Sequence, residues 1–397
     1  MAETVTVEQV RALVQAQHLD TIAIRRHLHA RPELSFQEHE TAAYIADRLR
    51  SWGVEVRTGI AGTGVVGVLR GSGDGPCVCL RADIDALPIQ ELADVPFRSQ
   101  VPGVMHACGH DVHTAMVLAA GRILHGLRGA WPGTVLLLFQ PGEEKIPGGA
   151  SLVLKEGALA DPAPAAILGQ HVTPELEVGK VGFHAGPFMA SSDELYLTVK
   201  GRGGHAAQPD KLVDPILIAA RLLLALKEEF EAWRGDRPLV LAFGRLVADG
   251  ATNVVPDEVH IAGTLRTFDE RLRAEVHAWL PQKAGEFCAA LGGACHTEVR
   301  HGYPVLVNHD DLTNRIRMAA VEFLGADNVV DMPRRMGSED FAFYSQVMPA
   351  SFHRLGTGNP RKGPAPGLHT PHLVIPEEAM AIGAGLMVWG ALKELRG

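Results

Sequence analysis

One stretch constrains the fold more than any other: residues 134–140, Thr-Val-Leu-Leu-Leu-Phe-Gln, which Pro-Gly-Glu-Glu follows. A continuous apolar run of this length is typical of a strand that is buried on both faces of a sheet. Other strands are expected at 64–70, 76–81 and 166–170, and helices at 7–29, 41–52, 114–127 and 148–157. Strands that alternate with helices predict the α/β class, here a mixed, mostly parallel sheet that helices cover.

Reactive side chains follow three of these strands where each one ends. Asp83 and Asp85 come after the second strand, Glu143 and Glu144 after the run 134–140, and His171 after 166–170. Each has an ordinary explanation, since paired glutamates are mostly solvated and a histidine after a strand mostly lies in a loop. Ligands of open α/β sheets bind beyond the carboxyl ends of the strands. The coincidence at three strand ends therefore predicts a metal or acid/base site.

The segment 106–113, His-Ala-Cys-Gly-His-Asp-Val-His, is the densest group of possible metal ligands. A turn at Gly109 can aim Cys108 and His110 at one ion, and thiolate and imidazole together suit zinc and similar metals. The segment is expected to form a loop leading into a helix, whose positive end lowers a thiol pKa. A cysteine nucleophile paired with His110 is the alternative, but it leaves the glutamate pair without a role.

Composition excludes several classes of protein. A chain of 397 residues favours two domains, and the net charge of −9 offers no surface for nucleic acid or anionic membrane. No apolar run reaches the roughly 18 residues that a membrane span needs, and the first residues lack a signal-peptide pattern. Five cysteines without a disulfide spacing fit a reducing compartment. We expect a cytoplasmic protein that binds neither nucleic acid nor membrane.

A second domain is expected from 189 to 300, inserted into a first domain made of 1–188 and 301–397. Its expected elements are strands at 194–200, 239–247, 258–268 and 295–301 and helices at 214–231 and 270–291. This βαββαβ order is that of a ferredoxin-like unit, which is a compact domain of its own. An inserted domain next to a reactive site suggests a lid.

Eight motifs, in order along the chain, resemble those of the M20 metallopeptidase family. They are Leu-Arg-Ala-Asp-Ile-Asp-Ala-Leu-Pro (80–88), the segment 106–113, Phe-Gln-Pro-Gly-Glu-Glu (139–144), Gly-Arg-Gly-Gly-His-Ala-Ala-Gln-Pro (201–209), Thr-Asn-Val-Val-Pro (252–256), Gly-Thr-Leu-Arg-Thr-Phe (263–268), Gly-Ser-Glu-Asp-Phe (337–341) and Leu-His-Thr-Pro (368–371). Within the family they are similar to the amidohydrolase branch, which includes hippurate hydrolases, N-acyl-amino-acid hydrolases and plant auxin-conjugate hydrolases. The resemblance spans about residues 25–385.

The resemblance implies a site for two divalent ions, zinc, manganese or cobalt. The implied ligands are Cys108, His110, Glu144, His171 and His369, with Cys108 as the bridge. Glu143 is the implied general base that deprotonates the attacking water. Asp83 and Asp85 are expected to hold ligand imidazoles from behind, or else to be turn residues after a strand. His106 and His113 match the motif outside its ligand positions and are expected to support the site or to pack.

Three residues of the expected inserted domain are implied to contact substrate. His205, in a glycine-rich loop, polarises the scissile carbonyl in the family, often from the partner subunit of a dimer. Asn253 and Arg266 could hold the substrate carboxylate, since guanidinium grips a carboxylate through two bonds. The alternatives are that Asn253 shapes a turn and that Arg266 forms a cross-strand ion pair. The resemblance also implies a homodimer through this domain, or a higher oligomer.

The expected activity is metal-dependent hydrolysis of an N-acyl amino acid or a related small amide to a carboxylic acid and an amino acid. Lys145, which follows the glutamate pair, could change the pKa of the base or point into solvent. A dipeptidase or aminopeptidase of the same family and a non-catalytic ligand-binding relative remain as alternatives. No spacing of a nucleotide-binding loop is found, so no nucleotide cofactor is expected.

Overall fold

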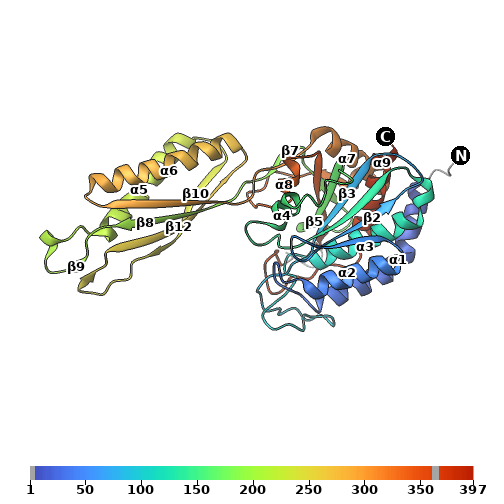
Figure 1. Cartoon of the computed structure of the whole chain (residues 1–397), viewed down its shortest axis with the longest axis horizontal. Helices are drawn as coiled ribbons and strands as arrows, with labels where there is room; N and C mark the ends of the chain where they lie inside the picture. The colour runs from blue at the N-terminus through green and yellow to red at the C-terminus, as the bar shows by residue number, and fades with distance from the viewer. Residues whose placement is uncertain (1–4, 360–365, 397) are drawn as a thin grey trace. The chain divides into compact units, whose positions relative to one another are not determined.

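The computed structural model describes residues 5–359 and 366–396 of the chain. The chain divides into two compact units (Figure 1). The larger unit consists of Met1–Gly186, Val307–Pro333 and Glu339–Gly397, and the second unit, called the satellite below, consists of Pro187–Leu306 and Arg334–Ser338. The satellite is thus an insertion, and a short later segment of the chain also belongs to it.

The larger unit is built on an eight-stranded sheet with the strand order β1-β2-β4-β3-β5-β16-β6-β15. The strands are β1 (Glu55–Ile60), β2 (Gly64–Arg70), β3 (Cys77–Asp83), β4 (Thr134–Gln140), β5 (Ala166–Glu177), β6 (Val181–Phe183), β15 (Val329–Asp331) and β16 (Ala350–Gly358). The pairs β4–β3, β3–β5, β5–β16 and β6–β15 are parallel, and the other three are antiparallel. The predicted mixed, mostly parallel sheet is confirmed.

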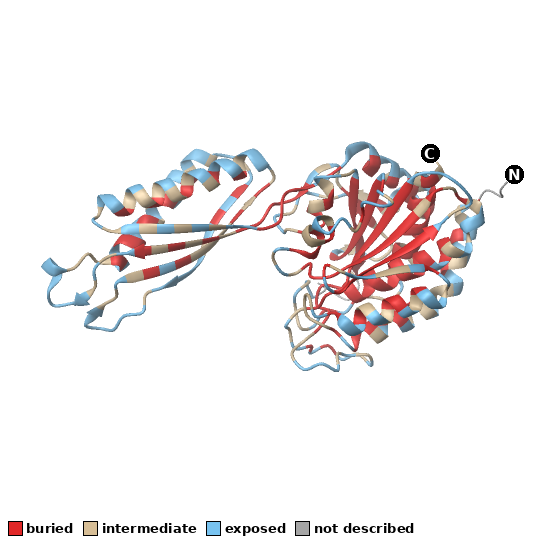
Figure 2. Ribbon diagram, viewed as in Figure 1, coloured by how far each residue is buried: buried red, intermediate tan, exposed pale blue. Residues whose placement is uncertain are grey.

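Helices cover this sheet and share one apolar core with it. They are α1 (Val7–His29), α2 (His39–Ser51), α3 (His110–Gly126), α4 (Gly149–Lys155), α7 (Asp310–Leu324), α8 (Ala342–Ser345) and α9 (Ala379–Arg396). Side chains of α1, α3 and α9 join those of β3 and β4 in a single buried cluster, and the central strands of the sheet are buried almost throughout (Figure 2). Burial on both faces explains why β4 reads as an unbroken apolar run.

Three predicted boundaries near the site were wrong. Helix α3 begins at His110 rather than at 114, and β3 continues to Asp83 rather than ending at 81. Strand β5 continues to Glu177 rather than ending at 170, because Val172 and Thr173 pair with Leu355 and Gly356 of β16. His171 therefore lies inside a strand, and its neighbours are fixed by a sheet partner nearly two hundred residues away, which local sequence patterns do not reveal.

The satellite has the predicted ferredoxin-like order β8 (Asp193–Lys200), α5 (Pro215–Arg234), β10 (Leu239–Val247), β12 (Glu258–Thr267), α6 (Glu270–Ala290) and β13 (Ala294–His301). Its four strands form an antiparallel sheet with the order β10-β12-β8-β13, and its apolar side chains form a separate core with those of the two helices. A two-stranded ribbon, β9 (Gly204–His205) with β11 (Val254–Val255), extends it. Two further short strands, β7 (Gly186–Met189) and β14 (Leu306–Asn308), flank the insertion in the sequence.

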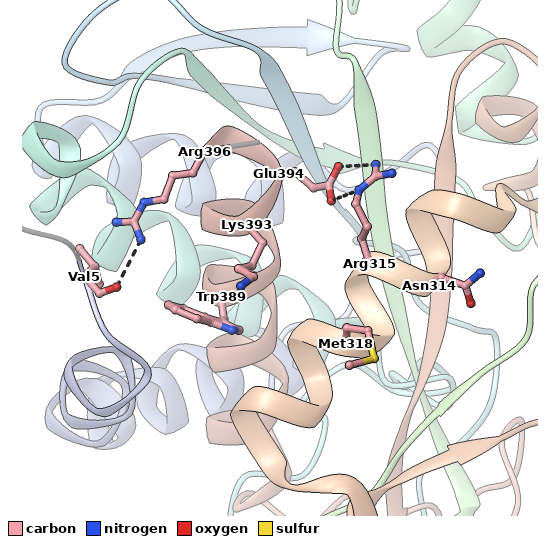
Figure 3. A pocket seen from close by; sticks show the side chains of 8 residues that line it. All are labelled: Val5, Asn314, Arg315, Met318, Trp389, Lys393, Glu394 and Arg396. Carbon is pink, nitrogen blue, oxygen red and sulfur yellow. Dashed lines mark hydrogen bonds and ion pairs between the residues drawn. The ribbon is translucent and has the colours of Figure 1, made fainter.

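A mostly apolar cavity of about 500 Å³ lies beside α7 and α9 in the larger unit (Figure 3). Met318 and Trp389 line it, and the ion pair between Arg315 and Glu394 lies at its edge. Arg396 donates to the backbone oxygen of Val5, so the last helix is tied to the first described residue. Among the described residues, no helix combines the length and the apolar character that crossing a bilayer requires.

Candidate metal centre

The fold brings the five predicted ligands together in the larger unit. Cys108 lies in the turn before α3, and His110 is the first residue of that helix. Glu144 follows β4, His171 lies in β5, and His369 lies in the loop before α9. A left-handed glycine joins the first two, because Gly109 has a φ of 85° and a Cβ there would meet Ile375 and Val172 at 2.6 and 2.7 Å. Only glycine fits this turn without displacing its neighbours.

Cys108 lies at the middle of the cluster. Its Sγ lies 3.4 Å from Nε2 of His171 and 3.3 Å from Nε2 of His369, and the latter lies 3.1 Å from Oε1 of Glu144. The donor atoms of Cys108, His110 and His171 lie within 4.8 Å of one another, and so do those of Cys108, Glu144 and His369. Cys108 is thus common to two groups of possible metal ligands.

Oxygen atoms behind the imidazoles fix which nitrogen faces the cluster. Nδ1 of His171 lies 2.7 Å from the backbone oxygen of Val172, and Nδ1 of His110 lies 2.9 Å from the backbone oxygen of Asp85 and 3.1 Å from its carboxylate. Nδ1 is therefore the donor in both rings, so Nε2 is the nitrogen that could bind a cation. Nε2 of His110 is buried and has no hydrogen-bond partner. A cation would satisfy it.

His113 and His106 differ from the histidines that are predicted to be ligands. Nδ1 of His113 lies 2.6 Å from the Asp83 carboxylate, while its Nε2 accepts the N–H of Val172 at 3.0 Å. Both nitrogens are engaged, so His113 supports the strand that carries His171 and has no lone pair for a metal. His106 is buried, and burial lowers its pKa to about 4, which keeps the ring neutral.

His369 has an unusual backbone conformation. Its φ is 61°, a left-handed value that residues with a side chain seldom adopt. Its N–H donates to the backbone oxygen of Ala107 at 2.8 Å, next to Cys108. Hydrogen bonds to Cys108 and Glu144 raise the pKa of the imidazole to about 10. Without a metal ion, these two hydrogen bonds therefore favour the protonated form of His369.

Glu143 lies beside the cluster and is buried. Burial, together with the negative charges of Glu339, Glu144 and Asp340, raises the pKa of its carboxyl well above the usual range. The backbone N–H of Asp340 lies 3.3 Å from its Oε1 and orients the group. Lys145 is exposed and is not among the charges that act on Glu143. Of its two interpretations, pointing into solvent is the one that the structure shows.

Comparison with known proteins identifies the family. The profile of Peptidase family M20/M25/M40 matches residues 79–389. The chain belongs to this family. It is 41% identical over 307 residues to an N-acyl-L-amino acid amidohydrolase of Geobacillus stearothermophilus, covering 77% of this chain and 82% of that protein. It is 38% identical over 373 residues to IAA-amino acid hydrolase ILR1-like 4 of Arabidopsis thaliana, covering 92% and 83%. The predicted resemblance to the amidohydrolase branch is confirmed.

A solved structure agrees with this assignment. The YxeP protein of Bacillus subtilis, described as a dinuclear metal binding peptidase from the M20 family, superposes with a TM-score of 0.83 at 34% identity. The match covers 96% of this chain and 99% of that one. The eight-stranded sheet with a separate small antiparallel sheet is therefore the M20 arrangement of a larger domain and a satellite.

A buried network of charges supports the M20 site from behind. Arg81 donates to Asp83 at 2.7 Å, to Glu339 at 3.0 Å and to Asp340 at 2.8 Å. Asp83 in turn holds His113, whereas Asp85 holds His110 and accepts the backbone N–H of Glu144 at 3.0 Å. Asp85 thus contacts a predicted ligand, whereas Asp83 holds His113, which is not one of the predicted ligands. Arg81 was missed, because an arginine inside an apolar strand carries no local signal of its partners.

A second network on the other side of the motif was also missed. Asp111, next to His110, accepts from Arg25 at 2.7 Å and lies 2.9 Å from Nδ1 of His29, whose Nε2 lies 3.1 Å from Glu91. The charge of Arg25 and the ring of His29 hold the pKa of Asp111 well below its usual range. The only sequence signal was the Asp in the motif itself, because Arg25 and His29 read as ordinary polar positions of an amphipathic helix.

The three predicted substrate residues lie in the satellite. His205 and Asn253 are neighbours at the β9–β11 ribbon, where the backbone oxygen of Asn253 accepts the N–H of Ala206 at 3.0 Å. Strand β12 begins at Glu258, and Arg266 lies near its C-terminal end. At about 3.3 Å per residue, Arg266 is roughly 26 Å from Glu258. It donates to the hydroxyls of Ser338 and Thr264, and within the described residues it forms no ion pair. One satellite does not bring all three residues together.

Proposed function

We propose that this M20 protein hydrolyses the amide bond of N-acyl amino acids, or of closely related conjugates, in a metal-dependent reaction. The products are a carboxylic acid and a free amino acid. The observation that supports this most strongly is that a thiol, three imidazoles and two carboxylates meet in one place although they come from four separate segments of the chain. The names of the amidohydrolase relatives support the substrate class.

The residues of the site fit two divalent ions. One ion would take Cys108, His110 and His171, and the other would take Cys108, Glu144 and His369, with the thiolate shared. Burial and the charge of Glu144 raise the pKa of the Cys108 thiol, a cost that a bound cation removes. Sulfur, nitrogen and oxygen donors suit zinc, while manganese and cobalt are the other candidates. When bound, such ions make water a nucleophile near neutral pH and polarise a carbonyl oxygen.

Glu143 moves the proton. Bound cations would favour its ionised form, which takes a proton from the attacking water, and burial, which favours the protonated form, then holds that proton. The same carboxyl group then gives the proton to the leaving amine. Asp340 keeps the base in position through its N–H, and Arg81 keeps the Asp340 carboxylate in position.

The satellite is proposed to complete the substrate site from a second copy of the chain. Nδ1 of His205 accepts the N–H of Ala207 at 3.1 Å, so the proton of the neutral ring lies on Nε2, which can donate to a substrate oxygen. Asn253 lies beside it, whereas Arg266 lies near the C-terminal end of β12. This separation supports a homodimer. In it, His205 and Asn253 contact the substrate bound by the partner subunit, and Arg266 binds the carboxylate of the substrate in its own subunit.

The experiment that tests the function is a substrate panel. Protein stripped of metal and reloaded with zinc, manganese or cobalt is assayed with acetyl, benzoyl, indole-acetyl and long-chain N-acyl amino acids, with a chelator as the control. We expect hydrolysis that depends on metal and stops with chelator. A dipeptide with a free α-amine is the comparison substrate. Faster cleavage of that dipeptide would identify a dipeptidase instead, and binding without turnover would identify a non-catalytic relative.

A further inference from the structure

Two cysteines of the satellite meet where α6 ends and β13 begins. Cys288 lies in the last turn of α6, and Cys295 is the second residue of β13. The backbone oxygen of Cys288 accepts the N–H groups of Leu291 at 3.1 Å and Gly293 at 2.9 Å, so the turn between the two elements is tight. Both cysteines are free thiols. Both side chains belong to the packed core of the satellite, where Cys295 packs against the cluster that contains Cys288.

The two thiols differ in exposure and hydrogen bonding. Cys288 is fully buried in the core of the satellite, whereas Cys295 is half-buried on β13, an edge strand of the sheet. The interaction between the two thiols lowers the pKa of Cys295 to about 7 and raises that of Cys288. A half-exposed thiolate with a buried thiol against it is the usual arrangement of an attacking and a resolving cysteine.

The remaining cysteines lack these properties. Burial raises the pKa of Cys77 to about 11 and that of Cys79 well above its usual range. The Cys108 thiol is buried within the ligand cluster, and burial raises its pKa as well. Only the thiolate of a cysteine is an effective nucleophile. Cys295 is thus the cysteine that an oxidant would reach and react with first.

We propose that Cys288 and Cys295 form an oxidisable pair that a peroxide converts to an intramolecular disulfide. The Cys295 thiolate attacks one peroxide oxygen, the O–O bond breaks, and hydroxide leaves while Cys295 becomes a sulfenic acid. The Cys288 sulfur then attacks the Cys295 sulfur, the S–O bond breaks, and water leaves with the proton of Cys288. Two thiols and one hydrogen peroxide give one disulfide and two waters, so the peroxide is reduced as the sulfurs are oxidised.

The disulfide would join the end of a helix to an edge strand. Helix α6 contributes Val276, Leu280 and Ala284 to the satellite core, and β13 is paired to the sheet through β8 alone. A covalent link from α6 to β13 therefore opposes local unfolding of the edge strand. The site lies outside the ligand cluster and does not depend on the proposed function.

The test uses the full-length protein with its metals, treated with a small molar excess of hydrogen peroxide and then alkylated. Intact mass spectrometry should show the loss of two hydrogen atoms, and a digest without reductant should contain one peptide pair joined through Cys288 and Cys295. Dithiothreitol should reverse both. Cys77→Ser is the matched control because it removes a buried cysteine outside the pair, and it should form the same disulfide as the unmodified chain.

Two variants separate the steps. Cys288→Ser has no resolving sulfur, so peroxide should add one oxygen at Cys295, in a form that dimedone captures. Cys295→Ser has no attacking thiolate, so the mass should stay unchanged under the same treatment. The proposal is overturned if the unmodified chain only gains oxygen, if Cys108 is the residue oxidised, or if the disulfide joins two chains.

Discussion

The direction of each imidazole decides its role in the site. His110 and His171 donate from Nδ1 to oxygen atoms and turn Nε2 toward Cys108, whereas His113 has both nitrogens engaged. The sequence showed the histidines of the motif, and only the family resemblance separated ligands from supporting groups. Spacing alone could not do so, because the partners that fix each ring, such as Asp83 and Val172, come from other strands.

Glu143→Gln tests the base. The amide has nearly the same shape but accepts no proton, so we expect kcat to fall by about 10²–10⁴-fold. The bound metal should remain, because Glu143 is not among the proposed ligands. Steady-state kinetics with an N-acyl amino acid and a metal assay on the same sample measure both quantities. Normal kcat in this variant would show that another group takes the proton.

Asp85→Asn tests the residue behind His110. The Asp85 carboxylate contacts His110 Nδ1 and accepts both the N–H of Glu144 and the hydroxyl of Ser35 at 2.7 Å. We expect metal affinity to fall by about 10–100-fold, the usual effect of losing such a partner. Competition with a coloured chelator measures it. Asp94→Asn, at an exposed position, is the control and should bind metal normally. Equal metal affinities in the two variants would show that Asp85 stabilises the turn without supporting metal binding.

At the scale of elements, the strands show which strand boundaries the sequence predicts and which strands it does not reveal. The bounds of β2, β4 and β10 match those expected from the sequence, because continuous or alternating apolar residues end at turn residues there. The missed strands β1, β6 and β15 are short or half-exposed, and β6 and β15 have only three residues each. Such strands exist because a neighbour in the sheet pairs with them, which their own residues do not show.

The turn that carries Glu143 and Glu144 is held by a buried glutamate that was also missed. Oε1 of Glu38 accepts the N–H of Gly142 and that of Phe36, each at 2.9 Å, and Oε2 accepts the hydroxyl of Thr63 at 2.5 Å. Glu38 is fully buried, and burial raises its pKa. Glu38, in the segment between α1 and α2, thus holds the turn that precedes Glu143.

Glu38→Ala should therefore affect both stability and turnover. Three polar groups lose their acceptor, which should lower the free energy of unfolding by about 2–4 kcal/mol. We expect kcat to fall with little change in KM, because the turn before Glu143 loses its hydrogen bond. Glu38→Gln keeps an acceptor oxygen and should restore most of kcat. If the alanine and glutamine variants lose the same activity, Glu38 does not act through these hydrogen bonds.

At the scale of the whole molecule, each unit has its own core and its own buried charges. In the satellite, Asp193 accepts from Arg273 at 2.7 Å and 2.9 Å and lies 2.8 Å from Nε2 of His277. These partners lower the pKa of Asp193 from 3.8 to about 2. The carboxylate lies at the start of β8, where the chain begins the satellite sheet.

Acid should therefore weaken the satellite through Asp193. Its pKa is lower in the folded state, so its contribution of about 2 kcal/mol is present above pH 3.8 and is lost as the pH falls through about 2. Unfolding by denaturant, followed from about pH 5 to about pH 2, measures this. Asp193→Asn should be less stable at the higher pH and should lose less stability on acidification. Parallel pH profiles of the two proteins would contradict the assignment.

The most direct test of the account is the number of divalent ions per chain in the unmodified protein and in Cys108→Ala, with Cys77→Ala as the control. Elemental analysis after dialysis against metal-free buffer measures it. We predict two ions in the unmodified chain and in the control, and the loss of both in Cys108→Ala, because each group of ligands contains this thiolate. Two ions retained without Cys108, or fewer than two in the unmodified chain after reloading, would contradict the shared-thiolate site.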